Sequence, residues 1–171
     1  MRIDTERLIL HPMTLENLKT ASKDLQAVVR EYGASLPYIG FWEMRSKRKI
    51  YKAKADLISR NPASWLLTTS WLIIEKNTLI YTGEAGFKGI PSGGTVEIGY
   101  GMLEDFRNKG YMTEAVGVLT RMAFLQKQYT VKRTAALTLP ENISSHRVLE
   151  KNQYVRQSSR GKYWVWERAA E

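Results

Sequence analysis

The residues from Val96 to Phe124 constrain the fold most strongly, because they carry a strand, a tight turn and a helix in direct succession. The strand is apolar, and two glycines inside it, Gly99 and Gly101, predict a bulge or a close approach by another backbone. The helix ends near Phe124, and its apolar residues share the spacing of one face: Met112, Ala115, Val116, Leu119, Met122 and Ala123. The turn would therefore end at a helix N-terminus, whose free amides and dipole make it an anion site.

The segments on either side continue the alternation of strands and helices. Helix-spaced apolar residues follow Thr14, a good N-cap residue, and a later helical stretch is basic on its outer face. We predict strands over 7–11, 65–75, 79–89, 96–103, 132–139, 154–158 and 163–167, and helices over 15–28, 44–58, 110–124 and 142–151. This order predicts an α/β (α+β) protein with a mixed sheet and helices on both faces.

Composition sets bounds on the class of protein. The 171 residues are enough for one domain, spanning 1–171, with a sizeable core. The absence of cysteine fits a reducing compartment and excludes a thiolate nucleophile. No apolar stretch reaches the roughly 20 residues that a membrane helix needs, and no signal-peptide core occurs, so we expect a soluble cytoplasmic protein. The net charge of +9 indicates solubility and attraction to a polyanionic cofactor, with a nucleic-acid partner as the alternative.

Three segments carry a resemblance to a known family. The turn Arg107-x-x-Gly110-x-Met112 resembles the pyrophosphate-binding loop of the GNAT superfamily of N-acetyltransferases, Gln/Arg-x-x-Gly-x-Gly/Ala. The run EIGYGMLEDFRNKGYMTEA is similar to the ribosomal-protein (RimJ/RimL-like) branch, as are TERLILHPMTLENL and ENISSHRVLEKNQY, and the three occur in the family's order. Met112 and Gln153 depart from the small residue and the glycine of the family, but neither removes a backbone amide.

The resemblance implies the GNAT-like acyl-CoA N-acyltransferase fold, with a mixed, mostly antiparallel central sheet, and acetyl-CoA as co-substrate. In that family the central strand splays from the next strand, and the pantetheine arm lies in the opening on backbone groups, here those of residues 100–103. The pyrophosphate would lie on the amides of residues 108–113. The implied cofactor-binding residues are Met102, Leu103, Arg107, Asn108, Lys109, Gly110, Tyr111, Met112, Thr113 and Asn142.

Acetyl transfer to an amine needs one group that takes the proton of the amine and another that stabilises the leaving thiolate. The resemblance implies that Glu97 is the general base; the alternative is a glutamate that faces solvent or pairs with an arginine. It also implies that Asn142 binds the pantetheine arm and that Ser145, three residues on and on the same helix face, lies near the sulfur. A plain helix cap and a surface serine are the alternatives, and Tyr154 is a second candidate proton donor.

The acceptor side is implied by the resemblance alone. In GNAT proteins the segment between the first two helices shapes the acceptor pocket, so Tyr38, Phe41 and Trp42 would line it; ordinary core aromatics are the alternative. His11 and His146 are the only histidines and have no acidic partner at metal spacing, so we expect no metal.

We therefore expect an acetyl-CoA-dependent N-acetyltransferase that acts on a primary amine by direct attack. The ribosomal branch suggests a protein N-terminal amine as acceptor, while polyamines and aminoglycosides stay open. Two other classes are alternatives: a module that senses acyl-CoA without turnover, and a nucleic-acid-binding domain, which is disfavoured because aromatic and basic residues do not alternate. The expected partners are acetyl-CoA and the amine, without a membrane, and the chain would be a monomer or a homodimer.

Overall fold

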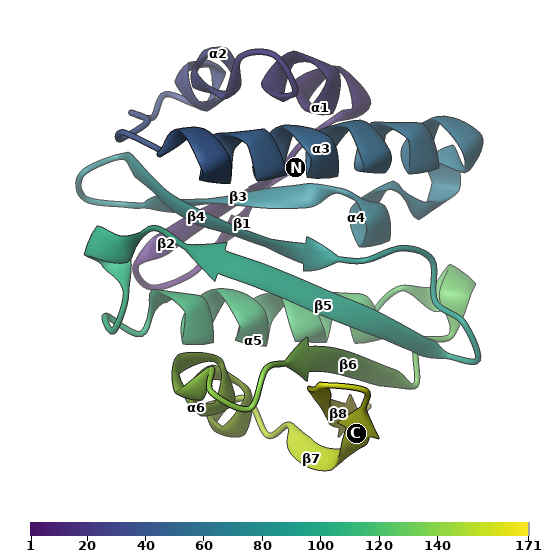
Figure 1. Cartoon of the computed structure of the whole chain (residues 1–171). Helices are drawn as coiled ribbons and strands as arrows, with labels where there is room; N and C mark the ends of the chain where they lie inside the picture. Colours follow the sequence, from purple (N-terminus) through teal and green to yellow (C-terminus); the bar gives the residue numbers. More distant parts are fainter. Residues whose placement is uncertain (171) are drawn as a thin grey trace.

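Eight strands form one mixed sheet in the computed structural model of the chain, which describes residues 1–170 without the side chain of Lys127 (Figure 1). Across the sheet the strands follow the order β1-β2-β3-β4-β5-β6-β8-β7. Neighbours are antiparallel except β5 and β6, which run parallel, so the predicted mixed and mostly antiparallel sheet is confirmed. The strands are β1 (Ile3–Asp4), β2 (Leu8–Pro12), β3 (Ser70–Glu75), β4 (Ile80–Phe87), β5 (Thr95–Met102), β6 (Arg133–Thr138), β7 (Val155–Arg160) and β8 (Tyr163–Ala169).

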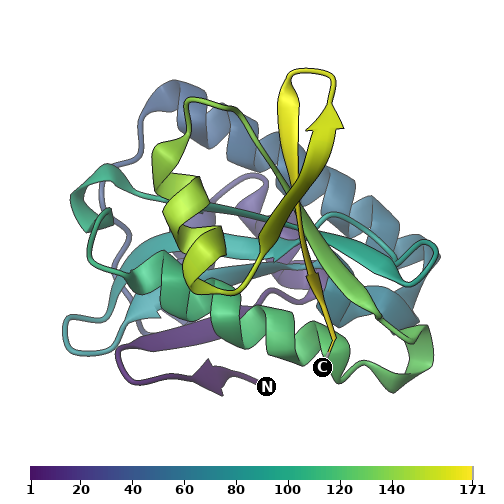
Figure 2. The ribbon, with the colours of Figure 1, turned by 90° about the horizontal axis from the view of Figure 1, so that it is seen from below.

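Helices cover both faces of the sheet, as predicted. The long helix α3 lies across one face with α1 and α2 beyond it, and α5 lies on the other face (Figure 1, Figure 2). In Figure 2 the β7–β8 hairpin projects from the sheet on the side of α3. The helices are α1 (Leu15–Ala21), α2 (Leu25–Glu31), α3 (Phe41–Arg60), α4 (Trp65–Thr68), α5 (Tyr111–Phe124) and α6 (Ile143–Lys151), with 3₁₀ turns at Pro62–Ser64, Glu104–Phe106 and Lys127–Tyr129.

Side-chain alternation along β5 separates a packed face from an open one. Val96 and Ile98 are buried in the apolar cluster that packs against α5. A second cluster, which includes the buried Tyr51 of α3, packs α1, α2 and α3 against the strands on the other face. The alternate residues of β5 face this second side, and two of the four are glycines: Thr95, Glu97, Gly99 and Gly101.

The prediction of one helix over 15–28 is wrong, because the chain turns between α1 and α2. Thr14 caps α1 as expected, and its side chain accepts a hydrogen bond from a backbone amide of the first turn. Asp24 then caps α2 in the same way. The second cap restarts the helix while the buried residues keep their spacing, so periodicity did not reveal the break.

The predicted strand over 65–75 begins only at Ser70. Its first residues form α4, directly after a 3₁₀ turn that starts at Pro62. The indole nitrogen of Trp65 donates to the carbonyl of Met13 at 2.8 Å, which anchors this helical turn to a distant segment. Short apolar runs do not distinguish a strand from a buried helical turn, so this contact decided the outcome.

Candidate active site

Strands β5 and β6 separate after a short region of pairing. Their parallel register joins only Thr95–Glu97 to Arg133–Ala135, although β5 continues to Met102 and β6 to Thr138. On its other edge β5 stays paired with β4 up to its last residue. The edge of β5 that faces β6 is therefore open beyond Glu97, as expected for a central strand that splays from the next one.

The turn after β5 presents backbone amides at the start of α5. Gly110 precedes the helix in a left-handed conformation, with φ of 79°, and Asn108 has φ of 61°. A side chain at Gly110 would be strained in this conformation, which accounts for the glycine. The first turn of α5 thus offers free amides and the positive end of the helix dipole to an anion.

A first cavity, of about 720 Å³, lies beside this turn and continues along the end of β5. Most of the predicted cofactor-binding residues line it: Met102, Arg107, Asn108, Gly110, Tyr111, Met112, Thr113 and Asn142. Leu103 instead packs into the cluster on the α3 side, and its amide donates to the carbonyl of Thr82 at 2.9 Å. Lys109 is outside the lining, with its ammonium 5.1 Å from the ring centre of Phe106.

The N-terminal segment holds the turn in place. The Arg7 guanidinium donates through Nε to Glu114 Oε2 and through Nη1 to the carbonyl of Lys109, each at 2.8 Å. Thr5 and the amide of Arg7 donate to the other oxygen of Glu114, Oε1. Burial raises the pKa of Glu114, but these hydrogen bonds and the Arg7 charge outweigh burial, so the pKa lies below its usual value. Sequence reasoning missed this link, whose partners are 107 residues apart.

Asn142 and Ser145 lie at the start of α6 and line the first cavity. Asn142 caps the helix, because its Oδ1 accepts from the amide of Ser145 at 3.1 Å. The Asn142 amide nitrogen makes no hydrogen bond within residues 1–170, so it is available to a ligand. The Ser145 side chain has Tyr100 as a hydrogen-bond partner. Tyr100 donates its hydroxyl to the carbonyl of Ser145 at 3.3 Å, and burial raises the pKa of Tyr100. Tyr154 lies in the core and lines neither this cavity nor the second.

A second cavity, of about 440 Å³, adjoins the first on the side of α3. The two linings share Tyr100, Gly101, Asn142 and Ser145. A Cβ atom at Gly101 would meet nothing within 4 Å, so the strand is open to ligands at this point. The second cavity therefore leads from the α3 side to the residues that also end the first.

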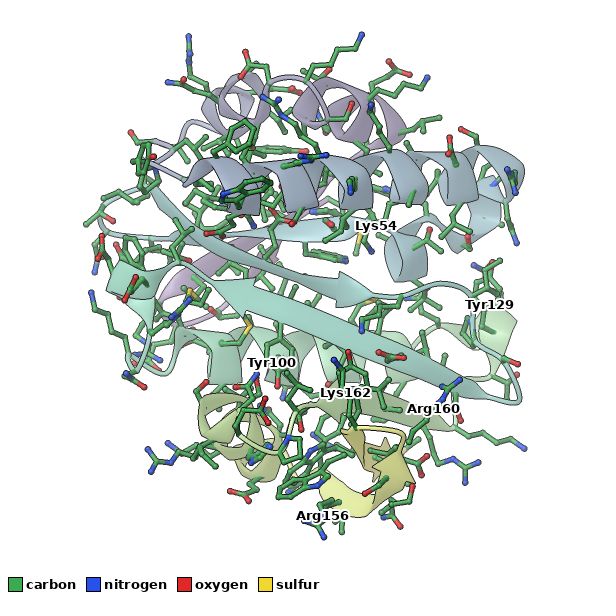
Figure 3. All side chains as sticks on the ribbon, viewed as in Figure 1. Lys54, Tyr100, Tyr129, Arg156, Arg160 and Lys162 are labelled. Carbon is green, nitrogen blue, oxygen red and sulfur yellow. The ribbon has the colours of Figure 1, made fainter. Side chains whose placement is uncertain are left out.

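Lys54 forms part of the wall of the second cavity, where it reaches from α3 toward the sheet (Figure 3). Its ammonium donates to the carbonyls of Thr68 and Phe87 at 2.8 Å and of Thr69 at 3.1 Å. Burial lowers the pKa of Lys54 to about 8. All three donors are used on the backbone, so Lys54 fastens α3 to the ends of α4 and β4.

Glu97, the predicted base, is engaged by a lysine. Its Oε1 lies 2.5 Å from the ammonium of Lys88, and Lys88 rather than Glu97 lines the second cavity. The expected alternative of a paired glutamate is thus present, with a lysine in place of the arginine. The basic role of Glu97 stays a prediction.

Glu84 lines the second cavity and was not singled out from the sequence. Its Oε1 accepts hydrogen bonds from the hydroxyls of Tyr51 and Tyr81, the latter at 2.7 Å, and from Lys47 at 3.3 Å. The one available signal was a single charged residue in the otherwise uncharged strand β4, IYTGEAGF.

The aromatic residues expected at the acceptor lie elsewhere on α3 and before it. Tyr38 is 91% exposed and Trp42 is 73% exposed, so neither is a core aromatic. Tyr38 and Phe41 line a separate hollow with Arg45 and Arg48, while neither cavity at the split includes Trp42. Their role in acceptor binding stays a prediction.

The two histidines stack on aromatic rings, His11 on Tyr32 and His146 on Trp164. Within residues 1–170 no group of three His, Cys, Asp or Glu residues is placed to hold a metal ion. In the same range no helix combines the length and apolarity needed to cross a membrane.

Comparison with known proteins identifies the family. Residues 7–155 match the model of the Acetyltransferase (GNAT) domain. A relative, the uncharacterized N-acetyltransferase YjdG of Bacillus subtilis (strain 168), is 29% identical over 171 residues, which cover 96% of either chain.

Solved structures share the fold over almost the whole chain. A GNAT-family acetyltransferase from Bacillus anthracis has a TM-score of 0.65 at 21% identity, covering 99% of this chain and 98% of that one. The ribosomal L7/L12 α-N-protein acetyltransferase RimL in complex with coenzyme A has a TM-score of 0.65 at 17% identity, with coverage of 99% and 98%. Ribosomal-protein-S5-alanine acetyltransferase from Vibrio fischeri has a TM-score of 0.66 at 15% identity, with coverage of 99% and 96%. Since the family match spans most of the sequence, the chain belongs to the GNAT family and is an acetyl-CoA-dependent N-acetyltransferase.

Proposed function

We propose that this enzyme acetylates the α-amine of a protein N-terminus by direct attack on acetyl-CoA. The observation that carries the proposal is that the two cavities meet at Tyr100, Gly101, Asn142 and Ser145. A thioester arm along the open edge of β5 and an amine that enters beside α3 would meet there from different sides. The sequence has no cysteine that could carry the acetyl group between them.

The residues of the two linings would divide the work of the reaction. The amides at the start of α5 would hold the pyrophosphate, with Arg107 adding charge. The amine nitrogen attacks the thioester carbonyl, the carbon–sulfur bond breaks, and the hydroxyl of Ser145 is the proposed donor to the thiolate. For the amine proton we keep Glu97 as the proposed base. Because Lys88 occupies one of its oxygens, Glu97 would act through a water molecule.

The choice of a protein N-terminus rests on the fold neighbours, two of which are named as acetyltransferases of ribosomal proteins. The open second cavity supports it, because an extended peptide end needs access from outside. A cytoplasmic location, a single domain over 1–171 and a monomer or homodimer also remain part of the proposal.

Thiol release from acetyl-CoA over a panel of amines tests this function. The panel contains a lysine-free peptide with a free N-terminus, an N-acetylated peptide with one lysine, spermidine and an aminoglycoside, and an amine-free reaction measures hydrolysis. We expect release with the first peptide. Release with spermidine or the aminoglycoside alone would mean that the acceptor is a small amine and not a protein N-terminus. Binding of acetyl-CoA without any thiol release would favour the acyl-CoA-sensing alternative.

A further inference from the structure

Glu84 is the one carboxylate in the lining of the second cavity, as far as residues 1–170 are concerned. It lies on β4 directly opposite Gly101 of β5, and the space beside Gly101 is open. The glycine leaves room next to the carboxylate at the point where the two cavities meet. Glu84 therefore lies beside the place where the linings of the two cavities join.

The two oxygens of Glu84 are used unequally. Oε1 accepts from Tyr51, Tyr81 and Lys47, and both tyrosine side chains come from buried residues. Oε2 accepts no hydrogen bond from the described residues. The Glu84 side chain is 12% exposed, and Oε2 is not among the buried polar atoms that lack a partner, so it keeps access to the cavity. One oxygen thus fixes the carboxylate and the other is left for a donor from outside.

The lysines of the same lining are largely committed to the protein. The ammonium of Lys54 donates three hydrogen bonds to backbone carbonyls. Lys47 is shared between Glu84, Tyr81 and Glu43. Lys88 pairs with Glu97. Because these three cations border the cavity, a cationic ligand is favoured only beside a carboxylate, and Glu84 Oε2 is the available carboxylate oxygen.

We propose that Glu84 Oε2 binds the ammonium form of the acceptor and orients it before the proton is removed. The proposal rests on the proposed function and adds the chemical class that the second cavity selects: a primary alkylammonium rather than a neutral or weakly basic amine. Glu84 is in this view a binding residue, distinct from the base that takes the proton. Tyr51, Tyr81 and Lys47 position it.

Glu84→Gln tests this assignment, because glutamine keeps the shape and can still accept from the tyrosines. The KM for a peptide α-amine should rise about 10- to 100-fold, as expected for the loss of a charge-assisted hydrogen bond. The kcat should stay within about threefold and the affinity for acetyl-CoA should be unchanged. With methoxyamine, which is neutral at pH 7, the KM should not change. Glu167→Gln is the matched control, since this strand glutamate lies outside both cavities and should alter neither constant.

The thermal unfolding midpoint of Glu84→Gln shows whether this variant folds. If it does not fold, a competition measurement on the unmodified enzyme tests the site instead. Propylammonium, a primary alkylammonium, should compete with the peptide amine and not with acetyl-CoA, whereas its neutral analogue 1-propanol should not compete. Equal inhibition by both compounds, or a variant that loses kcat at unchanged KM, would overturn the ammonium site. If no amine is acetylated by the unmodified enzyme, the proposed function fails instead, and calorimetry of propylammonium with the unmodified enzyme and with Glu84→Gln still tests the site.

Discussion

Glu97 and Glu84 lie on one face of β4 and β5 but are held in different ways. Glu97 shares one oxygen with a single, half-exposed lysine, Lys88. Glu84 is fixed by three donors from the interior. A carboxylate with one exposed partner can exchange that partner for water, whereas one fixed by three donors keeps its position. The two glutamates are therefore suited to proton transfer and to binding, respectively.

Glu97→Gln should lower kcat by about 10²–10⁴-fold, the usual contribution of a general base. The affinity for acetyl-CoA should barely change, because the glutamine keeps the shape of the strand. The deficit should shrink as pH rises toward the pKa of the amine, since more of the acceptor then arrives deprotonated. Steady-state rates across pH check this. Ser145→Ala is the comparison and should show a smaller loss without that pH trend. A variant with unmodified kcat at pH 7 would remove Glu97 from the mechanism.

Some residues of the candidate site could be recognised from the sequence, and others could not, for a physical reason. Gly110 and Asn142 stand in local motifs, a turn before a helix and a helix cap, so neighbours along the chain reveal them. Glu84 acquires its setting from Tyr51 of α3 and from the pairing of β4 with β5, which tertiary packing alone brings together. No spacing along the chain encodes that contact.

Among the elements, the N-terminal segment has a role that reaches the turn before α5. Arg7, the residue before β2, binds both the carboxylate of Glu114 and the carbonyl of Lys109, so one side chain links the start of β2 to the first turn of α5 and to the loop in front of it. The turn proposed to bind the cofactor is therefore supported by a residue about a hundred positions earlier in the sequence.

Arg7→Ala should destabilise the fold by about 1 kcal/mol at pH 7, since the ion pair is only partly buried. The folded-state pKa of Glu114 is depressed, so the stability that it contributes is present above its unfolded value of 4.5 and is lost as pH falls through the folded value. The difference between the two proteins should thus shrink below pH 4.5. Urea unfolding at pH 7 and pH 3 measures it. Arg2→Ala removes the exposed pair with Asp4 and should change little; an equal loss would contradict the special role of Arg7.

Helices and strands were predictable from the sequence where the pattern of their own residues determines the secondary structure. The strand over 96–103 and the helix that follows were found because alternation and helical spacing are both strong there. α4 was missed because Trp65 is held by the carbonyl of Met13, and α2 because Asp24 caps a new helix inside a continuous apolar pattern. The spacing of apolar residues, on which the prediction relied, reveals neither the hydrogen bond of Trp65 to a distant carbonyl nor the cap at Asp24.

At the scale of the whole molecule, positive charge gathers where a polyanion is expected. Arg107, Arg147 and Lys151 all line the first cavity, and Glu43 is the one acidic residue in the described part of that lining. With a net charge of +9, the protein also attracts anions at longer range. The charge is thus best explained by the phosphates of the cofactor.

Affinity for acetyl-CoA should fall roughly tenfold between about 50 and 500 mM salt, because mobile ions screen these charges. Arg147→Ala should weaken binding at low salt and flatten the salt dependence, as measured by calorimetry. Arg160 lies on the β7–β8 hairpin (Figure 3) and lines neither cavity, so Arg160→Ala is the control and should leave the affinity unchanged. If the affinity for acetyl-CoA does not change with salt concentration, the prediction is wrong and uncharged contacts provide the binding free energy.

The split between β5 and β6 divides the sheet into two blocks, β1–β5 and β6–β8, whose backbones pair only over Thr95–Glu97 and Arg133–Ala135. The cofactor arm proposed for the open edge of β5 would cover backbone groups that no described strand pairs with. In that arrangement each departure of CoA would uncover a strand edge in the middle of the sheet, the kind of surface to which extended segments of other chains add. A steady supply of acetyl-CoA would serve this enzyme as protection against self-association, in addition to its part in the reaction.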